Sequence, residues 1–190
     1  LMMDSPLLIS SLIRHAARVY ADQTLVSRTV EGPIHRTDYQ EIHVRAQKLA
    51  QALQALGVRP GDRVATLAWN GYRHVETYFA VSGIGAVCHT LNPRLFFDQL
   101  LYILGHAEDV LLLVDLTFLP LAEKLAPRCP GLRGVVVMTD REHLPAHSLP
   151  HVHVYEDMIA AQPGGLEWPS FDENTASSLC YTSGTTGDPK

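Results

Sequence analysis

The sequence has no long apolar run and no basic block, and each absence excludes a class of protein. No uninterrupted stretch approaches the roughly 18 apolar residues of a membrane span, so we expect no transmembrane segment. No block of basic residues occurs and the formal net charge is −5, so nothing favours a nucleic-acid partner. The first residues lack a basic segment ahead of their short apolar run, which argues against a secretory signal and for a cytoplasmic protein.

Cysteines are also few. There are 3, an odd number, and none lies in a CxxC pair, so neither a disulfide framework nor a zinc cluster is indicated. Four histidines gather in a proline-containing stretch without a cysteine partner or an HExxH arrangement, which disfavours a metal site there: His143, His147, His151 and His153. What remains is a chain of 190 residues, 46% hydrophobic and 18% charged, which suits one folded domain with a sizeable core.

The N-terminal part predicts two helices on either side of a β-hairpin. Apolar residues recur on one helical face from Leu8 to Tyr20. After the hairpin, Thr37 is predicted to cap a long helix, with Gln40 completing a capping box, and Gly57 ends that helix. The hairpin strands flank a glycine turn and are predicted at Leu25–Arg28 and Ile34–Arg36.

From Pro60 onward, short apolar strands alternate with helices of about ten residues, a pattern typical of a parallel sheet covered on both faces. The predicted fold class is therefore α/β, with a largely parallel sheet flanked by helices on both faces and an N-terminal β-hairpin. The predicted strands are Arg63–Ala68, Val87–Leu91, Val110–Val114, Gly134–Met138, Val152–Val154 and Ser177–Tyr181. The predicted helices are His74–Ile84, Asp98–His106, Phe118–Ala126 and Glu156–Ala161.

Three features suggest other chemistry and are assigned structural roles. The glycines Gly83 and Gly85 begin like a dinucleotide fingerprint, but they precede a strand and lack a third glycine, so close helix–strand packing is the better interpretation. Asp115 follows a strand and could face a ligand, although capping the next helix is favoured. As nucleophiles, Ser183 lacks a GxSxG elbow and Cys180 lies in an apolar strand, where a thiol is usually inert.

The last ten residues, Tyr181–Lys190, form the most informative stretch. Their hydroxyls and glycines allow the backbone N–H groups and the O–H donors to converge on one anion, and Lys190 adds a flexible cation. The Walker A pattern does not fit, because Asp188 and Pro189 separate Gly187 from Lys190, where that pattern has an adjacent glycine and lysine. We predict a polyphosphate-binding loop formed by Thr182, Ser183, Gly184, Thr185, Thr186, Gly187 and Lys190.

Taken whole, the loop YTSGTTGDPK resembles the signature loop of the adenylate-forming (AMP-binding) superfamily. The stretch from Phe79 to Arg94, with its GIGAV and HTLNPR segments, is similar to a second core motif in the form associated with medium- and long-chain fatty acyl-CoA synthetases. Residues 37–42 and 172–176 are similar to further segments of these enzymes. The resemblance thus spans most of the chain.

The resemblance implies ATP-dependent activation of a fatty acid to an acyl-adenylate, followed by transfer of the acyl group to CoA. The loop would hold the ATP phosphates beside Mg²⁺ through positioning and electrostatics, and no residue of this chain is expected to be a catalytic acid or base. Family members are much longer, so residues 1–190 are expected to be the N-terminal part of the adenylation domain, without its C-terminal part and mobile lid domain, and inactive alone. A peripheral membrane contact and a homodimer stay open.

Two alternatives to a fatty acyl-CoA synthetase stay open as well. Another adenylating enzyme, either an aryl-CoA ligase or a peptide-synthetase adenylation domain, would share the loop and differ in its acid pocket. A non-enzymatic nucleotide-binding module would instead be complete in these 190 residues.

The loop assignment predicts the effect of replacing both Thr185 and Thr186 with Ala in the complete protein. Adenylate formation should slow by about 10²-fold or more, because the lost hydroxyls address phosphate, while the affinity for the acid should change little. Acid-dependent exchange of pyrophosphate into ATP measures this step, and an unchanged exchange rate would contradict the assignment.

Overall fold

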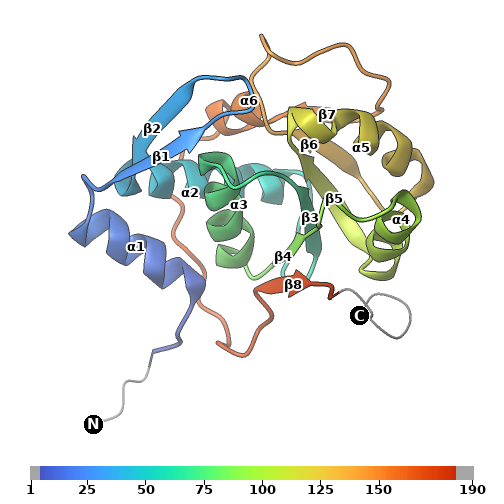
Figure 1. Cartoon of the computed structure of the whole chain (residues 1–190). Helices are drawn as coiled ribbons and strands as arrows, with labels where there is room; N and C mark the ends of the chain where they lie inside the picture. The colour runs from blue at the N-terminus through green and yellow to red at the C-terminus, as the bar shows by residue number, and fades with distance from the viewer. Residues whose placement is uncertain (1–4, 183–190) are drawn as a thin grey trace.

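The computed structural model describes residues 5–182 and contains a parallel sheet covered by helices (Figure 1). The sheet is six-stranded, in the order β7-β6-β5-β3-β4-β8, and every neighbouring pair is parallel. The α/β class predicted from the sequence is confirmed. The strands are β3 (Arg63–Leu67), β4 (Val87–Thr90), β5 (Asp109–Val114), β6 (Gly134–Val137), β7 (Val152–Val154) and β8 (Ser178–Cys180).

Helices cover both faces of the sheet, as predicted. Along β5, Leu111 and Leu113 join the core cluster of one face, and Leu112 and Val114 join the cluster of the other, as the period of two in a strand requires. One face is covered by α2 (Tyr39–Ala55), α3 (Tyr72–Gly83) and α6 (Tyr155–Ala160), and the other by α4 (Phe97–His106) and α5 (Leu119–Leu125). Short 3₁₀ turns at Leu116–Phe118 and Ala126–Arg128 flank α5.

The strand order places a topological switch point in the middle of the sheet. After β3, the chain adds β4 on one side and then crosses to add β5 on the other side of β3. In open α/β sheets, ligands bind at the carboxyl ends of the strands beside such a point. The carboxyl edge of β3, β5 and β8 is therefore where a functional site is expected.

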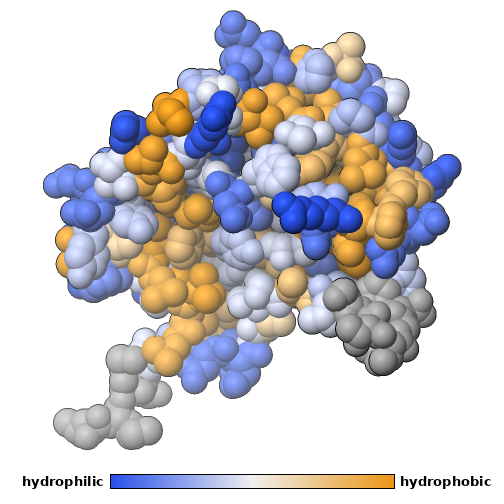
Figure 2. All heavy atoms as spheres, in the orientation of Figure 1, coloured by the Kyte–Doolittle hydropathy of each residue, from blue (hydrophilic) through white to orange (hydrophobic). Residues whose placement is uncertain are grey.

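The predicted hairpin is confirmed as β1 (Thr24–Arg28) paired antiparallel with β2 (Ile34–Asp38). Before it, α1 (Ile9–Val19) buries Ile13 against α2 and α3. On the outer side of the hairpin, Val26 and Ile34 are more than half exposed. Figure 2 shows apolar side chains over this hairpin interspersed with charged ones.

The predicted cap of the long helix α2 is wrong by one residue. Asp38, not Thr37, is the N-cap, and its carboxylate accepts a 2.8 Å hydrogen bond from the backbone N–H of Glu41. Thr37 is still paired with Leu25 in the hairpin, and its hydroxyl donates to the Glu41 carboxylate instead. β2 ends at Asp38, two residues beyond its predicted end at Arg36, and the helix therefore begins later than expected.

The predicted end of α2 is confirmed. Gly57 has a φ of +83°, its N–H donates to the carbonyl of Gln54, and the N–H of Val58 donates to the carbonyl of Leu53. These bonds satisfy carbonyls at the end of the helix that have no partner within it, and glycine takes the left-handed conformation at little cost.

A long connection, residues 162–177, returns from α6 to β8 across α2 and α3. The side chain of Gln47 donates to the Leu166 carbonyl, and the indole N–H of Trp168 donates to His43. A Cβ built on Gly83 would lie 2.4 Å from the Trp168 ring. The close packing predicted for Gly83 therefore involves this connection and not a strand.

This contact predicts that Gly83→Ala destabilises the protein. The added methyl group would displace Trp168, and overpacking of this kind costs about 1–3 kcal/mol. Gly105→Ala is the matched control, since Gly105 also lies in a helix but a Cβ there meets nothing within 4 Å. Alanine favours a helix over glycine by up to about 1 kcal/mol, so the control should be neutral or stabilising. Urea unfolding of the two variants measures the difference, and equal stabilities would contradict the packing argument.

Candidate functional site at the carboxyl edge of the sheet

The predicted phosphate loop begins at the carboxyl end of β8. Because β8 is parallel to β4, this end lies at the same edge of the sheet as the carboxyl ends of the other strands. Tyr181 and Thr182 are described by the structure. The remaining predicted loop residues lie outside the described residues: Ser183, Gly184, Thr185, Thr186, Gly187 and Lys190. The conformation of the two loop glycines therefore lies outside them as well.

Among the described strands, β8 lies at the end of the sheet, and its side chains are less buried than the sequence suggested. Ser178 and Cys180 are both exposed, so the burial that usually makes a thiol in an apolar strand inert is not found at Cys180. A strand at the end of a sheet has a neighbouring strand on one side only, so its side chains are covered less than those of a central strand. Position in the sheet, which the sequence of the strand does not contain, decides its exposure.

Tyr181 is held on the sheet by two histidines from other elements. Its hydroxyl lies 2.6 Å from Nδ1 of His106, the last residue of α4. Its ring lies 5.4 Å, centroid to centroid, from the ring of His89 in β4. Burial raises the pKa of Tyr181, so the phenol keeps its proton as a hydrogen-bond donor.

His89 belongs to a fully buried pair with Asp109. Its Nδ1 lies 2.8 Å from a carboxylate oxygen of Asp109, and neither side chain is exposed. The pair bridges β4 and β5 across the central strand β3, where the small Ala65 lies opposite His89. Burial raises the pKa of Asp109, and its bond to His89 partly opposes that rise. The other ring nitrogen, Nε2, is buried and has no hydrogen-bond partner in the part of the chain that the structure describes.

At the switch point itself, Asp115 ties the ends of two strands together. Its carboxylate accepts a 2.6 Å hydrogen bond from the backbone N–H of Trp69, just beyond β3. Asp115 occupies the N-cap position of the following 3₁₀ turn, but its side chain makes no capping bond. The favoured capping role is therefore wrong, because the carboxylate is used by a neighbouring loop. Burial raises the pKa of Asp115 to about 6.

A small cavity beside Asp115 has a volume of about 30 Å³, room for about one water molecule. It lies between the end of β3, the start of α3 and the hairpin, and is lined by Arg28, Thr29, Val30, Trp69, Gly71, Tyr72, Arg73, His74 and Asp115. A nucleotide needs a cavity of some 300 Å³ or more, so this one does not hold it.

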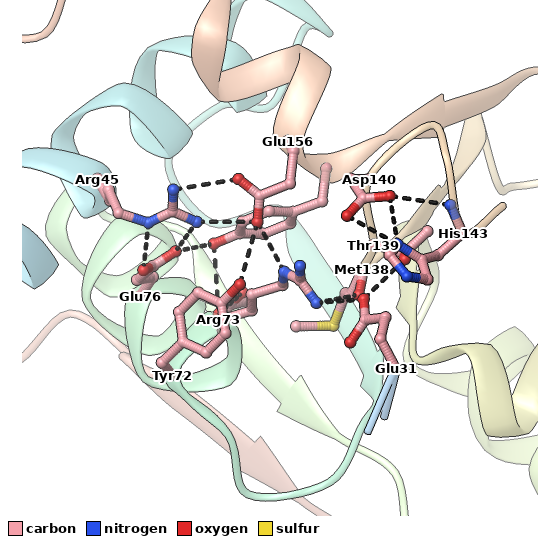
Figure 3. Close-up of polar contacts among 12 residues, drawn as sticks. Glu31, Arg45, Tyr72, Arg73, Glu76, Met138, Thr139, Asp140, His143 and Glu156 are labelled. Carbon is pink, nitrogen blue, oxygen red and sulfur yellow. Dashed lines mark hydrogen bonds and ion pairs between the residues drawn. The ribbon is translucent and has the colours of Figure 1, made fainter. Parts of the chain in front are cut away.

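Farther along the same edge, charged side chains form a continuous network, drawn in Figure 3. Arg45 from α2 contacts Glu76 at 2.6 Å and Glu156 at 3.1 Å, so it joins α3 to α6. Arg73 contacts Glu156 at 2.7 Å and Glu31 of the hairpin loop at 2.8 Å. Arg73 also donates to the carbonyl of Met138, directly after β6, so the network fastens the hairpin, three helices and the end of β6 to one another.

The pKa shifts in the network show that its arginines are committed to carboxylates. Burial alone would lower the pKa of Arg45, but the carboxylates of Glu76 and Glu156 together more than offset it, and the pKa is raised. Burial raises the pKa of Glu76, whose side chain is fully buried, although Arg45 opposes the rise. Four of the hydrogen bonds donated by Arg45 go to Glu76 and Glu156. An incoming phosphate would have to displace these bonds, so we assign the network a structural role.

The four histidines singled out in the sequence are not assembled into a ligand set. His143 contacts Asp140 at 2.8 Å, and that bond raises the pKa of His143. Across residues 5–182, no group of three or more His, Cys, Asp or Glu side chains is arranged to hold a metal ion. Within the same residues, no helix is both long and apolar enough to cross a membrane.

The sequence analysis missed the histidines around Tyr181 and the ion network. A signal for the network was present, because Glu76 interrupts the mostly apolar helix His74–Ile84 and a buried carboxylate requires a cationic partner. The partner, Arg45, lies 31 residues away in sequence and on a different helix. Its identity therefore depends on helix packing and could not be taken from either local pattern.

A parallel sheet that ends in a hydroxyl- and glycine-rich loop at its carboxyl edge is typical of nucleotide-binding α/β enzymes. The family can be stated, because a model described as "AMP-binding enzyme" matches residues 13–190. The chain belongs to this family of adenylate-forming enzymes.

Similar curated proteins are CoA ligases. The 3-methylmercaptopropionyl-CoA ligase of Ruegeria lacuscaerulensis is 49% identical over 189 residues, and the medium-chain-fatty-acid–CoA ligase of Ectopseudomonas oleovorans is 47% identical. The long-chain-fatty-acid–CoA ligase of Thermus thermophilus is 42% identical. Each alignment covers 100% of this chain but only 33–35% of the relative, so the chain spans about a third of the length of these relatives.

Solved structures agree on the fold. An anthranilate CoA ligase in complex with anthranoyl-AMP superposes with a TM-score of 0.82 at 28% identity, covering 98% of this chain and 34% of that chain. The acetoacetyl-CoA synthetase from Streptomyces lividans has the same TM-score at 23% identity and covers 95% and 29%, respectively. The latter likeness concerns the fold alone.

The raised pKa of Asp115 predicts how stability depends on pH. Between about pH 4 and 6 the folded state binds more protons at this carboxyl than the unfolded state, so the free energy of unfolding falls as pH rises through this window. Asp115→Asn keeps an oxygen acceptor for Trp69 and cannot ionise. The wild type should therefore lose up to about 3 kcal/mol more than the variant between pH 4 and 7. Urea unfolding at the two pH values measures this, and parallel losses in both proteins would contradict the assignment.

Proposed function

We propose that the complete protein is an acyl-CoA ligase that activates a carboxylic acid with ATP. The observation that carries the proposal is the alignment of the whole chain, phosphate loop included, with CoA ligases at 47–49% identity. The position of the loop at the carboxyl end of β8, on a sheet that superposes with a ligase bound to an acyl-adenylate, supports it.

In the proposed reaction, the carboxylate of the acid attacks the α-phosphorus of ATP. The bond to the β-phosphate oxygen breaks, pyrophosphate leaves and an acyl-adenylate forms. The CoA thiol then attacks the acyl carbon, loses its proton and displaces AMP to give the thioester. Negative charge grows on the leaving pyrophosphate, which is where donors of the loop would act.

The residues of this chain would contribute by positioning charge. The hydroxyls of Thr182, Ser183, Thr185 and Thr186, with the N–H groups at Gly184 and Gly187, would bind the β- and γ-phosphates. Lys190 would offset their charge. ATP would arrive with Mg²⁺, but because residues 5–182 contain no suitable ligand cluster, we assign no step to a metal held by this part of the protein.

We propose a medium-chain aliphatic acid as the substrate and CoA as the acceptor. The sequence motif that resembles fatty acyl-CoA synthetases and the 47% identity to a medium-chain enzyme support this choice. A second candidate is the short thioether acid named in the Ruegeria relatives, which are 49% identical. We further propose that residues 1–190 form the N-terminal part of an adenylation domain and act in fatty-acid metabolism in the cytoplasm. The three free thiols, Cys88, Cys129 and Cys180, fit a reducing compartment.

The test is an assay of the complete protein with a panel of acids. AMP and acyl-CoA formation would be followed with octanoate, hexadecanoate, 3-methylmercaptopropionate and anthranilate, each with and without CoA. We expect the highest kcat/KM for octanoate, with AMP formed in step with the thioester. A preference for 3-methylmercaptopropionate would select the second candidate, and no acid-dependent consumption of ATP with any acid would overturn the proposal. Lys190→Met, which removes the loop cation, is the control for contaminating activity.

A further inference from the structure

We propose that Tyr181 is a positioning residue for the phosphate loop, and that His106 and the buried pair of His89 and Asp109 hold it in place. The inference rests on the proposed function and concerns the nucleotide side of that site. Tyr181 itself need not touch ATP. It would act through the loop residues that follow it directly in the chain.

The first argument is how little else fixes the chain at this point. Strand β8 has three residues and pairs, among the described strands, with β4 alone. Ser178 and Cys180 are exposed, so they contribute little packing. Tyr181, which comes next, joins the apolar cluster beneath α4 and α5. Its ring therefore attaches the end of β8 to the core, one residue before the predicted loop begins.

The second argument is the direction in which Tyr181 is held. Its hydroxyl meets Nδ1 of His106 at 2.6 Å, and the His106 ring is itself stacked on Tyr102 at a centroid distance of 5.3 Å. Both of these residues belong to α4, a helix of ten residues packed on the sheet. The hydrogen bond therefore connects the end of β8 to a rigid element, and a fixed hydroxyl fixes the backbone from which the loop starts.

The third argument concerns the support beneath the Tyr181 ring. His89 could rotate in a core that offered it no partner, but its bond to Asp109 sets its ring orientation. The same bond leaves Nε2 buried and unpaired within the described part of the chain, 5.4 Å ring to ring from Tyr181. A buried nitrogen without a partner costs free energy that an apolar side chain would avoid. The ring that carries this nitrogen contacts Tyr181, so the buried pair supports the residue that precedes the predicted loop.

The test is a set of variants of the complete protein, assayed for KM of MgATP, KM of the acid, kcat and thermal unfolding. Tyr181→Phe removes only the hydroxyl. His106→Leu removes its partner, whereas His106→Asn keeps a polar atom near the position of Nδ1. Tyr20→Phe, on the exposed end of α1, is the matched control for loss of a tyrosine hydroxyl.

We expect Tyr181→Phe and His106→Leu each to raise KM of MgATP by about three- to tenfold, the range expected for one lost hydrogen bond, with KM of the acid within twofold of the wild type. The double variant should resemble the single variants, and His106→Asn should recover most of the loss. Tyr20→Phe should have no effect. The unfolding temperatures of the Tyr181 and His106 variants should stay close to that of the wild type.

Three results would overturn the inference. The first is an unchanged KM of MgATP in Tyr181→Phe, and the second is additive effects in the double variant. The third is an equal change in KM for ATP and for the acid together with a lower unfolding temperature, which would indicate a structural role only. The proposed function fails separately, because it fails when the wild-type protein itself shows no acid-dependent use of ATP.

Discussion

Burial of one parallel sheet on both faces is the constraint on which the rest of the structure depends. The side chains from Leu111 to Val114 are at most 1% exposed and alternate between the two cores, and each contributes about 1.5–3 kcal/mol by leaving water. Helices between most of the successive strands cover the two faces, and such crossovers make the strands parallel, although β6 and β7 are joined by residues 138–151 without a helix. Parallel strands bring all their carboxyl ends to one edge. The location of the candidate site is thus a consequence of how the core is buried.

That edge is divided into two parts with different chemistry. Beyond β6, the network around Arg45 and Arg73 pairs each arginine with two carboxylates and joins the hairpin to three helices. Replacing one member would leave a partner charge buried and unpaired, which is strongly destabilising, so these arginines serve the fold. Beyond β8, the polar groups belong to Tyr181 and the histidines that flank it. They form no arginine–carboxylate network, and the predicted phosphate loop begins directly after them.

The sequence predicted what depends on local pattern. The parallel sheet, the hairpin and the glycine that ends α2 all follow from residue type and spacing within a few positions, and all are confirmed. The errors share a different cause. Asp38 replaces Thr37 as a cap because the hairpin register extends the strand, and Asp115 bonds to Trp69 because β3 and β5 are neighbours. Cys180 is exposed because β8 lies at the edge of the sheet. Register, neighbours and edges are tertiary facts that no short window of sequence contains.

The predicted phosphate loop likewise combines a property that its own sequence predicts with a property that depends on distant residues. Its residue types identify the chemistry, since hydroxyls, glycines and a lysine in this order suit a polyphosphate whatever surrounds them. They do not say what places the loop. On the side that the structure describes, the placement comes from Tyr181, whose partners lie 75 residues away in α4 and in the buried pair that spans β4 and β5. A short edge strand cannot orient a loop alone, so a motif that binds phosphate depends on residues that carry no phosphate-binding signature. Catalysis depends on how precisely the hydrogen-bond donors are held. In our proposal, residues at this sheet edge that do not touch the ligand set that precision.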